Sequence, residues 1–251
     1  MSSIHRFFLP DAAQRTPLVL TGREAHHALD VMRLRRGDTL TVLDGAGNLF
    51  TCDIATTSRE RVTLTVKEKT FTAPLPCAVT LLAAIPKGKI EDIIEKATEL
   101  GVARIVPLFT ERTVVKIKPE EAAGKVEKWR RIASEAIKQC GSPWLPKIDP
   151  PIKLADYLAR GEVFELSLLG ALQADHRHPR DCFAASRAAL GRAPQTAAVW
   201  VGPERDFTPE EVAAIRAAGA APITLGPLVL RADTAAVYAL ALVSCEFNAS
   251  L

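Results

Sequence analysis

Hydrophobic and polar residues follow different patterns before and after residues 71–76. In the first part, short runs rich in Thr, Val and Leu are separated by turn residues; they cover residues 39–43, 48–55 and 61–69. Such runs are typical of β-strands. The turn at residues 44–48 contains two glycines, which supply the positive φ that tight connections need. This part is therefore predicted to be a small, mostly β domain.

Residues 71–76 separate this domain from the rest of the chain. The segment contains Pro74 and Pro76, and proline neither donates to a strand ladder nor continues a helix. We therefore expect two domains, covering residues 1–72 and 73–251.

The second part alternates between apolar runs and amphipathic stretches. Apolar runs at residues 78–84, 103–108, 163–169, 197–201 and 222–225 predict buried strands. Helical periodicity is found at residues 89–100, 120–140 and 233–247, and Thr208 with Glu211 forms a capping box at the start of a further helix. Alternation of this kind predicts an α/β fold with a parallel sheet and helices on both of its faces.

Composition restricts the class of protein. Hydrophobic residues make up 48% of the chain and charged residues 24%, which is typical of a packed globular protein. Five widely spaced cysteines form no C-x-x-C pair, so neither a disulfide framework nor a zinc site is expected. The apolar run at residues 78–85 is too short to span a bilayer, and residues 1–10 lack a signal-peptide core. We expect a cytoplasmic protein with no metal and no membrane association.

Two loops after predicted strands are candidates for a ligand site. Residues 201–207 and 225–235 each combine glycine with apolar residues, and ligands of open α/β sheets bind at the carboxyl ends of the strands. No phosphate-binding G-x-x-x-x-G-K-[ST] or dinucleotide-binding G-x-G-x-x-G motif is present, which argues against those ligands. From the residues alone, two ordinary turns remain an equal alternative.

A family resemblance rests on several motifs that occur in the same order. The motifs are His5-Arg6-Phe7-Phe8, residues 26–38, 87–102 and 129–148, Gly202-Pro203-Glu204 with Phe207, and Leu225-Gly226 followed by Leu230-Arg231 and Asp233-Thr234-Ala235. Together they resemble the ribosomal RNA small subunit methyltransferase E family of the SPOUT superfamily.

The resemblance implies a fold and an activity. The fold would be a PUA-like RNA-binding β-barrel over residues 1–72 and a SPOUT domain with a trefoil knot over residues 73–251, assembled as a homodimer. The activity would be methylation of N3 of a uridine in 16S ribosomal RNA of the small subunit, with S-adenosylmethionine as cofactor. Because N3 lies on the pairing edge of uracil, the base must be unpaired or flipped out.

The resemblance also implies site residues. The cofactor would be held by Leu168, Leu169, Val201, Gly202, Pro203, Glu204, Leu225, Gly226, Leu228, Val229, Leu230, Thr234 and Ala235. Arg231 would be the catalytic cation, although a salt bridge to Asp233 is an alternative role. Glu204 would either position the cofactor or cap the neighbouring helix.

Contact with RNA is assigned to basic residues of the first domain. Arg33, Arg35 and Arg36 lie close together, and Arg6 precedes two phenylalanines; arginine both pairs with phosphate and stacks on bases. An ordinary solvated surface is the alternative for this cluster.

The chain departs from the family pattern in three places. Arg205 and Asp206 stand where the family has two glycines, Asp233 replaces a glutamate, and Ser142-Pro143-Trp144 replaces an arginine-bearing stretch. If the backbone at residues 205–206 requires positive φ, each replacement costs about 1 kcal/mol.

Three other functions remain open, and the replacement by Arg205 and Asp206 is the feature that keeps a non-catalytic relative among them. A SPOUT enzyme that methylates a ribose 2′-hydroxyl is one alternative, and a non-catalytic RNA-binding relative is another. A third, an α/β enzyme acting on a small molecule, would leave the arginine cluster without a role.

Overall fold

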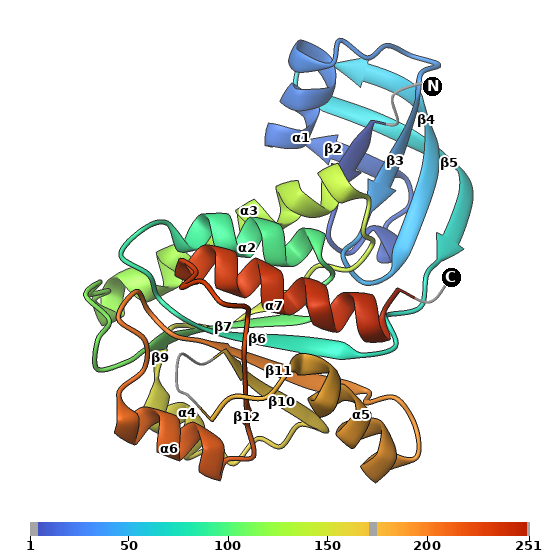
Figure 1. The fold of residues 1–251 in the computed structure, drawn as a ribbon. Coiled ribbons are helices and arrows are strands. Elements are labelled where there is room, and N and C mark those ends of the chain that lie inside the picture. Colours follow the sequence, from blue (N-terminus) through green and yellow to red (C-terminus); the bar gives the residue numbers. More distant parts are fainter. Residues whose placement is uncertain (1–4, 171–174, 250–251) are drawn as a thin grey trace. The chain divides into compact units, whose positions relative to one another are not determined.

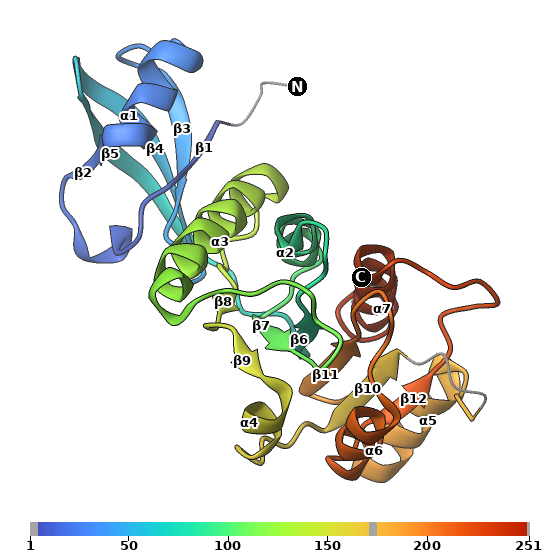
Figure 2. The ribbon, with the colours of Figure 1, turned by 90° about the vertical axis from the view of Figure 1, so that its left-hand side faces the viewer.

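A computed structural model describes residues 5–170 and 175–249 of the chain (Figures 1 and 2). The chain divides into two compact units, one of residues 1–74 and 134–145 and the other of residues 75–133 and 146–251. The first unit therefore takes in a segment beyond the expected boundary at residue 72. Helix α3 (Pro119–Cys140) contributes its last turns to that unit.

The first unit is built on a curled sheet with strand order β1-β3-β4-β5-β2. The strands are β1 (Arg6–Phe8), β2 (Leu18–Thr21), β3 (Thr39–Leu43), β4 (Asn48–Ser58) and β5 (Arg61–Phe71). Only β1 pairs in parallel, with β3. The sheet is a curled, open half-barrel (Figure 1), whereas the sequence predicted a PUA-like β-barrel. Strands β1 and β2 were not predicted because they are too short to show a period.

Alternation of side chains builds the core of this unit. Leu40 and Val42 of β3 and Val62 and Leu64 of β5 are buried against Phe7, as the period of two in a strand requires. The short helices η1 (Ala12–Gln14), α1 (Gly22–His26) and η2 (His27–Val31) connect β1 and β2 to β3.

The turn between β3 and β4 has the glycine geometry expected from the sequence. Gly45 and Gly47 have φ values of 76° and 96°. The buried Asp44 carboxylate accepts the N–H groups of Ala46 and Asn48, at 2.8 and 3.0 Å. The turn is therefore fixed by its own side chain.

The second unit contains the predicted parallel sheet, with strand order β12-β10-β11-β6-β7-β8 and with β9 paired to β7. The strands are β6 (Ala78–Ala84), β7 (Arg104–Phe109), β8 (Lys147–Ile148), β9 (Ile152–Lys153), β10 (Leu166–Gly170), β11 (Thr196–Val201) and β12 (Ala221–Ile223). All these pairings are parallel, which confirms the α/β prediction.

Helices cover both faces of this sheet. They are α2 (Ile90–Glu99), α3, α4 (Leu154–Leu158), α5 (Pro179–Leu190), α6 (Pro209–Ala217) and α7 (Ala232–Phe247). Helices α2 and α7 lie on one face, and α4 and α6 lie on the other (Figures 1 and 2). The capping box of α6 is present, with the Thr208 hydroxyl accepting from the Glu211 amide and the Glu211 carboxylate accepting from the Thr208 amide.

Helix α5 was not predicted from the sequence. His178 is its N-cap and accepts the Arg180 N–H at Nδ1 (3.2 Å), and Pro179 is its first residue. The strand predicted at residues 163–169 begins only at Leu166, because Val163 is exposed.

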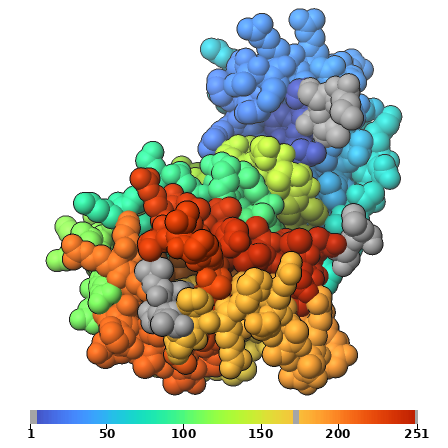
Figure 3. All heavy atoms as spheres, viewed as in Figure 1, coloured from blue at the N-terminus to red at the C-terminus, as the bar shows by residue number. Residues whose placement is uncertain are grey.

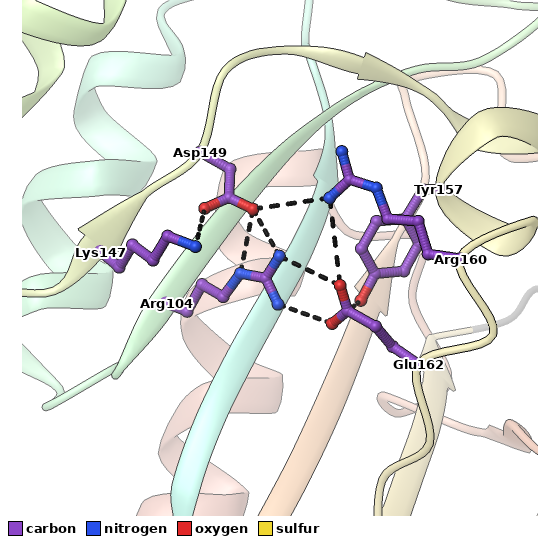
Figure 4. A network of polar contacts seen from close by, with 6 residues as sticks. All are labelled: Arg104, Lys147, Asp149, Tyr157, Arg160 and Glu162. Atoms are coloured by element: carbon purple, nitrogen blue, oxygen red, sulfur yellow. Dashed lines mark hydrogen bonds and ion pairs between the residues drawn. The ribbon is translucent and has the colours of Figure 1, made fainter.

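A network of charged side chains links the amino ends of the sheet strands (Figure 4). Arg104, at the start of β7, donates through Nε to Asp149 (3.0 Å) and through Nη1 to Glu162 (2.6 Å). The Tyr157 hydroxyl donates to Glu162 (3.1 Å), while Lys147 lies beside Asp149. Burial alone would raise the pKa of Asp149, but the Arg104 and Lys147 interactions outweigh it and hold that pKa below its usual value.

Asp149→Asn is therefore expected to destabilise the protein at neutral pH. The Asp149 side chain is only 6% exposed, and removing one partner of a buried ion pair typically costs about 3 kcal/mol. The control is Lys96→Gln, since the Lys96 side chain is half-exposed and an exposed pair contributes less than about 1 kcal/mol. Urea denaturation measures both.

The sign of the pH dependence follows from the lowered pKa. The stability from ionised Asp149 is complete above the unfolded-state pKa, about 3.9, and is lost as pH falls through the lower folded-state pKa. The difference between wild type and Asp149→Asn should shrink below about pH 4. Equal effects of the two substitutions at pH 7 would contradict this account.

Candidate functional site

The carboxyl ends of β10, β11 and β12 surround a pocket. The cavity volume is about 80 Å³, and the pocket is partly open to solvent. The described residues that line it are Gly170, Val201, Gly202, Pro203, Glu204, Asp206, Leu225, Gly226, Leu228, Val229, Leu230, Ala232 and Ala235. The two loops singled out in the sequence therefore meet at one site.

Most of the residues predicted to hold a ligand lie in this lining, but three do not. Leu168 and Leu169 are fully buried within β10, and Thr234 is exposed on the first turn of α7. Asp206 and Ala232 also line the pocket and lie within the two candidate loops, although neither was named individually, and Gly170 was not predicted at all. Gly170 is the last residue of β10, so the rule that ligands bind at strand ends was the signal for it.

The loop at residues 202–207 is a tight turn. The Asp206 N–H donates to the Pro203 carbonyl (2.8 Å). A Cβ atom on Gly202 would lie 2.9 Å from Asp206 Oδ1 and 3.1 Å from the Phe207 nitrogen. Only glycine fits at position 202 without a shift of the loop.

The two replacements of the family glycines differ in their backbone. Asp206 has φ 60°, in the left-handed region, whereas Arg205 does not have positive φ. Asp206 Oδ1 accepts the N–H of Phe207 at 2.8 Å, and aspartate tolerates this region because its short side chain bonds locally. The turn is therefore compatible with the residues that this chain carries.

The loop at residues 224–231 is held by a threonine and a glycine. Gly226 has φ 108°, and its N–H donates to Thr224 Oγ1 (3.1 Å). Leu228 and Val229 are 75% and 78% exposed. The loop thus presents backbone and apolar side chains to the pocket.

Glu204 connects the pocket to the neighbouring strand. Its Oε1 accepts the backbone N–H of Lys87 (2.6 Å), which lies in the loop after β6. The capping of α6 is carried by Thr208 and Glu211 instead. Arg112, after β7, donates to the carbonyls of Arg205 and Phe207.

Arg231 lies at the start of α7 and is exposed. It forms no ion pair with Asp233, whose carboxylate accepts the Thr234 N–H (2.7 Å). The salt bridge that the sequence left open is therefore absent between these two described residues.

The predicted RNA-contacting arginines lie in two settings. Arg33, Arg35 and Arg36 are exposed, while Leu34 between them is buried. The Arg6 side chain donates to the carbonyls of Lys138 (3.3 Å) and Gln139 (3.1 Å). Arg6 therefore helps to join β1 to the end of α3 within the first unit.

The part of the chain that the structure describes carries neither a metal-binding cluster nor a membrane-spanning helix. No group of three or more metal-binding side chains is found there. No helix in these residues combines the length and the apolar character needed to cross a bilayer. The described cysteines are all free thiols.

Comparison with known proteins identifies the family. Residues 73–244 match the RNA methyltransferase domain family, and residues 20–67 match the RNA methyltransferase PUA domain family. The ribosomal RNA small subunit methyltransferase E of Bacillus subtilis is 31% identical over 90% of this chain and 89% of its own length. The chain belongs to the ribosomal RNA small subunit methyltransferase E family.

Solved structures agree with this methyltransferase family in fold. A Legionella pneumophila protein, described as a methyltransferase in complex with the bound cofactor S-adenosylmethionine, matches with a TM-score of 0.84 and 31% identity. The match covers 96% of this chain and 97% of that one. The small subunit methyltransferase E of Neisseria gonorrhoeae, bound to S-adenosylmethionine, matches with a TM-score of 0.80 and 26% identity over 96% and 97% of the two chains.

The left-handed backbone at Asp206 can be tested by substitution. Asp206→Ala should lower the free energy of unfolding by about 2 kcal/mol, because it removes the acceptor of the Phe207 N–H, worth about 1 kcal/mol, and places alanine in the left-handed region. Asp206→Gly should cost about half of that or less, because glycine adopts this φ freely. Urea denaturation measures the free energy of unfolding of both variants. Equal losses would contradict the claim that the left-handed backbone at position 206 favours glycine over alanine.

Proposed function

We propose that this protein transfers the methyl group of S-adenosylmethionine to N3 of a uridine in 16S ribosomal RNA. The observation that carries the proposal is the meeting of the loops at residues 201–207 and 225–235 in one pocket. These loops hold the Gly202-Pro203-Glu204 and Leu225-Gly226 motifs on which the resemblance to the family rests. Relatives with the same fold are described with S-adenosylmethionine bound.

The residues of the pocket suit this cofactor. Gly202 has no room for a Cβ atom, and Gly226 has positive φ, so main-chain groups approach a ligand closely. Leu225, Leu228 and Leu230 supply apolar surface for an adenine ring. The Glu204 and Asp206 carboxylates in the lining suit the cationic and hydroxyl groups of S-adenosylmethionine.

The protein would position the two reactants and stabilise charge. S-adenosylmethionine supplies an electrophilic methyl group on its sulfonium. The imide proton of uridine N3 would pass to solvent water, and the negative charge would then spread onto the uracil carbonyl oxygens. Attack by N3 would form the N–CH3 bond as the S–CH3 bond breaks, which would release S-adenosylhomocysteine. Arg231, exposed at the start of α7, would stabilise that charge. The pocket would hold N3 and the methyl group in line.

The non-catalytic alternative rested on Arg205 and Asp206. Asp206 occupies its left-handed position with a local hydrogen bond to Phe207, and the loop remains part of the pocket lining. This favours a working cofactor site over a degenerate one.

We also propose that the C-terminal unit carries the trefoil knot of SPOUT enzymes. After the edge strand β12, the chain returns to the middle of the sheet, where α7 packs on β6 and β11.

The first unit, with its match to the PUA domain, would bind RNA through Arg33, Arg35 and Arg36. The functional division would then follow residues 1–72 and 73–251, in the cytoplasm.

A homodimer would form through α7. This helix lies at the surface of its unit (Figure 3), with Tyr238 46% exposed. Leu228 and Val229, in the loop before α7, are also exposed apolar residues. Light scattering of the purified protein should give twice the mass of one chain, and a monomer mass would contradict the dimer.

The methylation assay tests the function itself. Purified protein, S-adenosylmethionine and transcribed 16S ribosomal RNA or small subunits should yield 3-methyluridine, detected by mass spectrometry of the nucleosides. A 2′-O-methyl product would support the ribose alternative, and no product from either substrate would contradict the proposal.

Arg231→Gln should lower kcat about 100-fold, in the range found when a donor to a developing oxyanion is removed. The affinity for S-adenosylmethionine should change little, since Arg231 does not line the pocket. Arg192→Gln is the control, because Arg192 is exposed and paired with Glu165. If the two variants have the same kcat, Arg231 is not the catalytic cation.

A further inference from the structure

The loop that follows β6 brings two lysines to the carboxyl edge of the sheet. Lys87, Gly88 and Lys89 are exposed, and α2 begins at the next residue, Ile90. Strand β6 pairs in parallel with β11, so this loop is adjacent to the loop at residues 202–207. Neither lysine is part of the family-derived cofactor or RNA assignments.

A hydrogen bond fixes the loop to the pocket. The Lys87 N–H donates to Glu204 Oε1 at 2.6 Å, and Glu204 lines the pocket. On the other side, Arg112 donates to the Phe207 carbonyl at 3.3 Å. Hydrogen bonds therefore join the loop at residues 202–207 to the loops after both β6 and β7. The bond to Glu204 holds Lys87 beside the pocket wall.

The side chains of the two lysines have no polar partners among the described residues. Neither Lys87 nor Lys89 forms an ion pair or side-chain hydrogen bond with a described residue. Lys96, on the same helix, pairs with Glu95 and Glu99, each at 2.9 Å. Glu91, in the first turn of α2, pairs with Lys128 at 2.7 Å instead. Positive charge therefore remains available beside the pocket.

Phosphate is the anion that suits this position. The nucleotides that flank a target uridine carry backbone phosphates, and these must pass the rim of the pocket when the base enters it. Lysine is a compact point charge that binds phosphate without reading the base. Both lysines would therefore contribute to affinity for RNA and would not affect the choice of base.

We propose that Lys87 and Lys89 bind backbone phosphates of the RNA beside the target uridine, and that Glu204 is the positioning residue that holds their loop at the pocket. This rests on the proposed function, because it takes RNA as the substrate. It adds an RNA contact in the catalytic unit to those of Arg33, Arg35 and Arg36 in the first unit.

The test is the double variant Lys87→Gln/Lys89→Gln, measured with transcribed 16S ribosomal RNA by filter binding over a range of salt concentrations. Affinity at moderate salt should fall about tenfold, and the slope of log affinity against log salt should flatten by about 1.4, the value for two lost phosphate contacts with a single strand. Calorimetric affinity for S-adenosylmethionine should stay within about twofold.

The matched control is Lys96→Gln/Lys128→Gln. It removes the same charge from exposed lysines, but both of these are paired with glutamates. Its salt slope should equal that of wild type. If the Lys87/Lys89 variant keeps the wild-type affinity and slope, or loses no more than the control, the proposal is wrong.

The positioning role of Glu204 is tested separately. Glu204→Ala should raise the KM for RNA and speed hydrogen exchange of the Lys87 amide, because its acceptor is lost. Glu204→Gln should restore both, since the amide oxygen still accepts that N–H. Slow exchange at Lys87 in Glu204→Ala would contradict the role.

These outcomes are separable from those of the proposed function. RNA binding and its salt slope need no methyl transfer, so they decide the role of the lysines even if no product forms. A wild type that methylates RNA while the lysine variant matches the control would overturn this inference and leave the function intact.

Discussion

Strand β10 pairs in parallel with both β11 and β12, and the site depends on this arrangement. Because parallel strands end at the same edge of a sheet, the loops after β11 and β12 must emerge together. They face one another across Gly170, the last residue of β10. Without this pairing, two separate turns would remain and there would be no pocket.

The pocket wall is maintained by short-range constraints. There is no space for a side chain at Gly202. Asp206 has a left-handed backbone conformation, and its carboxylate accepts the N–H of Phe207. The left-handed conformation costs about 1 kcal/mol and a local hydrogen bond returns about the same. Glu204 and Arg112 then fix this turn to the loops after β6 and β7. The rigidity of the wall comes from hydrogen bonds between neighbouring loops.

Much of the fold was predictable from the sequence, because strands buried on both faces leave continuous apolar runs. Strand β6 was predicted with its observed bounds, and β11 to within one residue. Strand β1 was missed because it is only three residues long, and helix α5 was not predicted either. The curled open sheet of the first unit also depends on long-range pairing, which no local pattern reports.

Pocket residues were predictable where they come directly after the end of a strand and belong to the motifs shared with the family. Leu225 and Gly226 line the pocket, whereas Leu168 and Leu169, the two residues before Gly170, are buried in the strand. Arg6 was grouped with surface arginines, but its partners are carbonyls at residues 138 and 139, more than a hundred positions away in the chain. The Glu204 contact with Lys87 is equally remote in sequence.

Binding of S-adenosylmethionine to the purified protein tests the central claim most directly. Isothermal titration calorimetry would compare wild type with Gly226→Trp, which fills the pocket, and with Gly161→Trp. Gly161 also has positive φ and open space around it, but it precedes β10 at the opposite edge of the sheet. We predict micromolar binding to wild type and to Gly161→Trp, and none to Gly226→Trp. Failure of the wild type to bind, or equal binding by Gly226→Trp, would contradict the assignment of this pocket as the cofactor site.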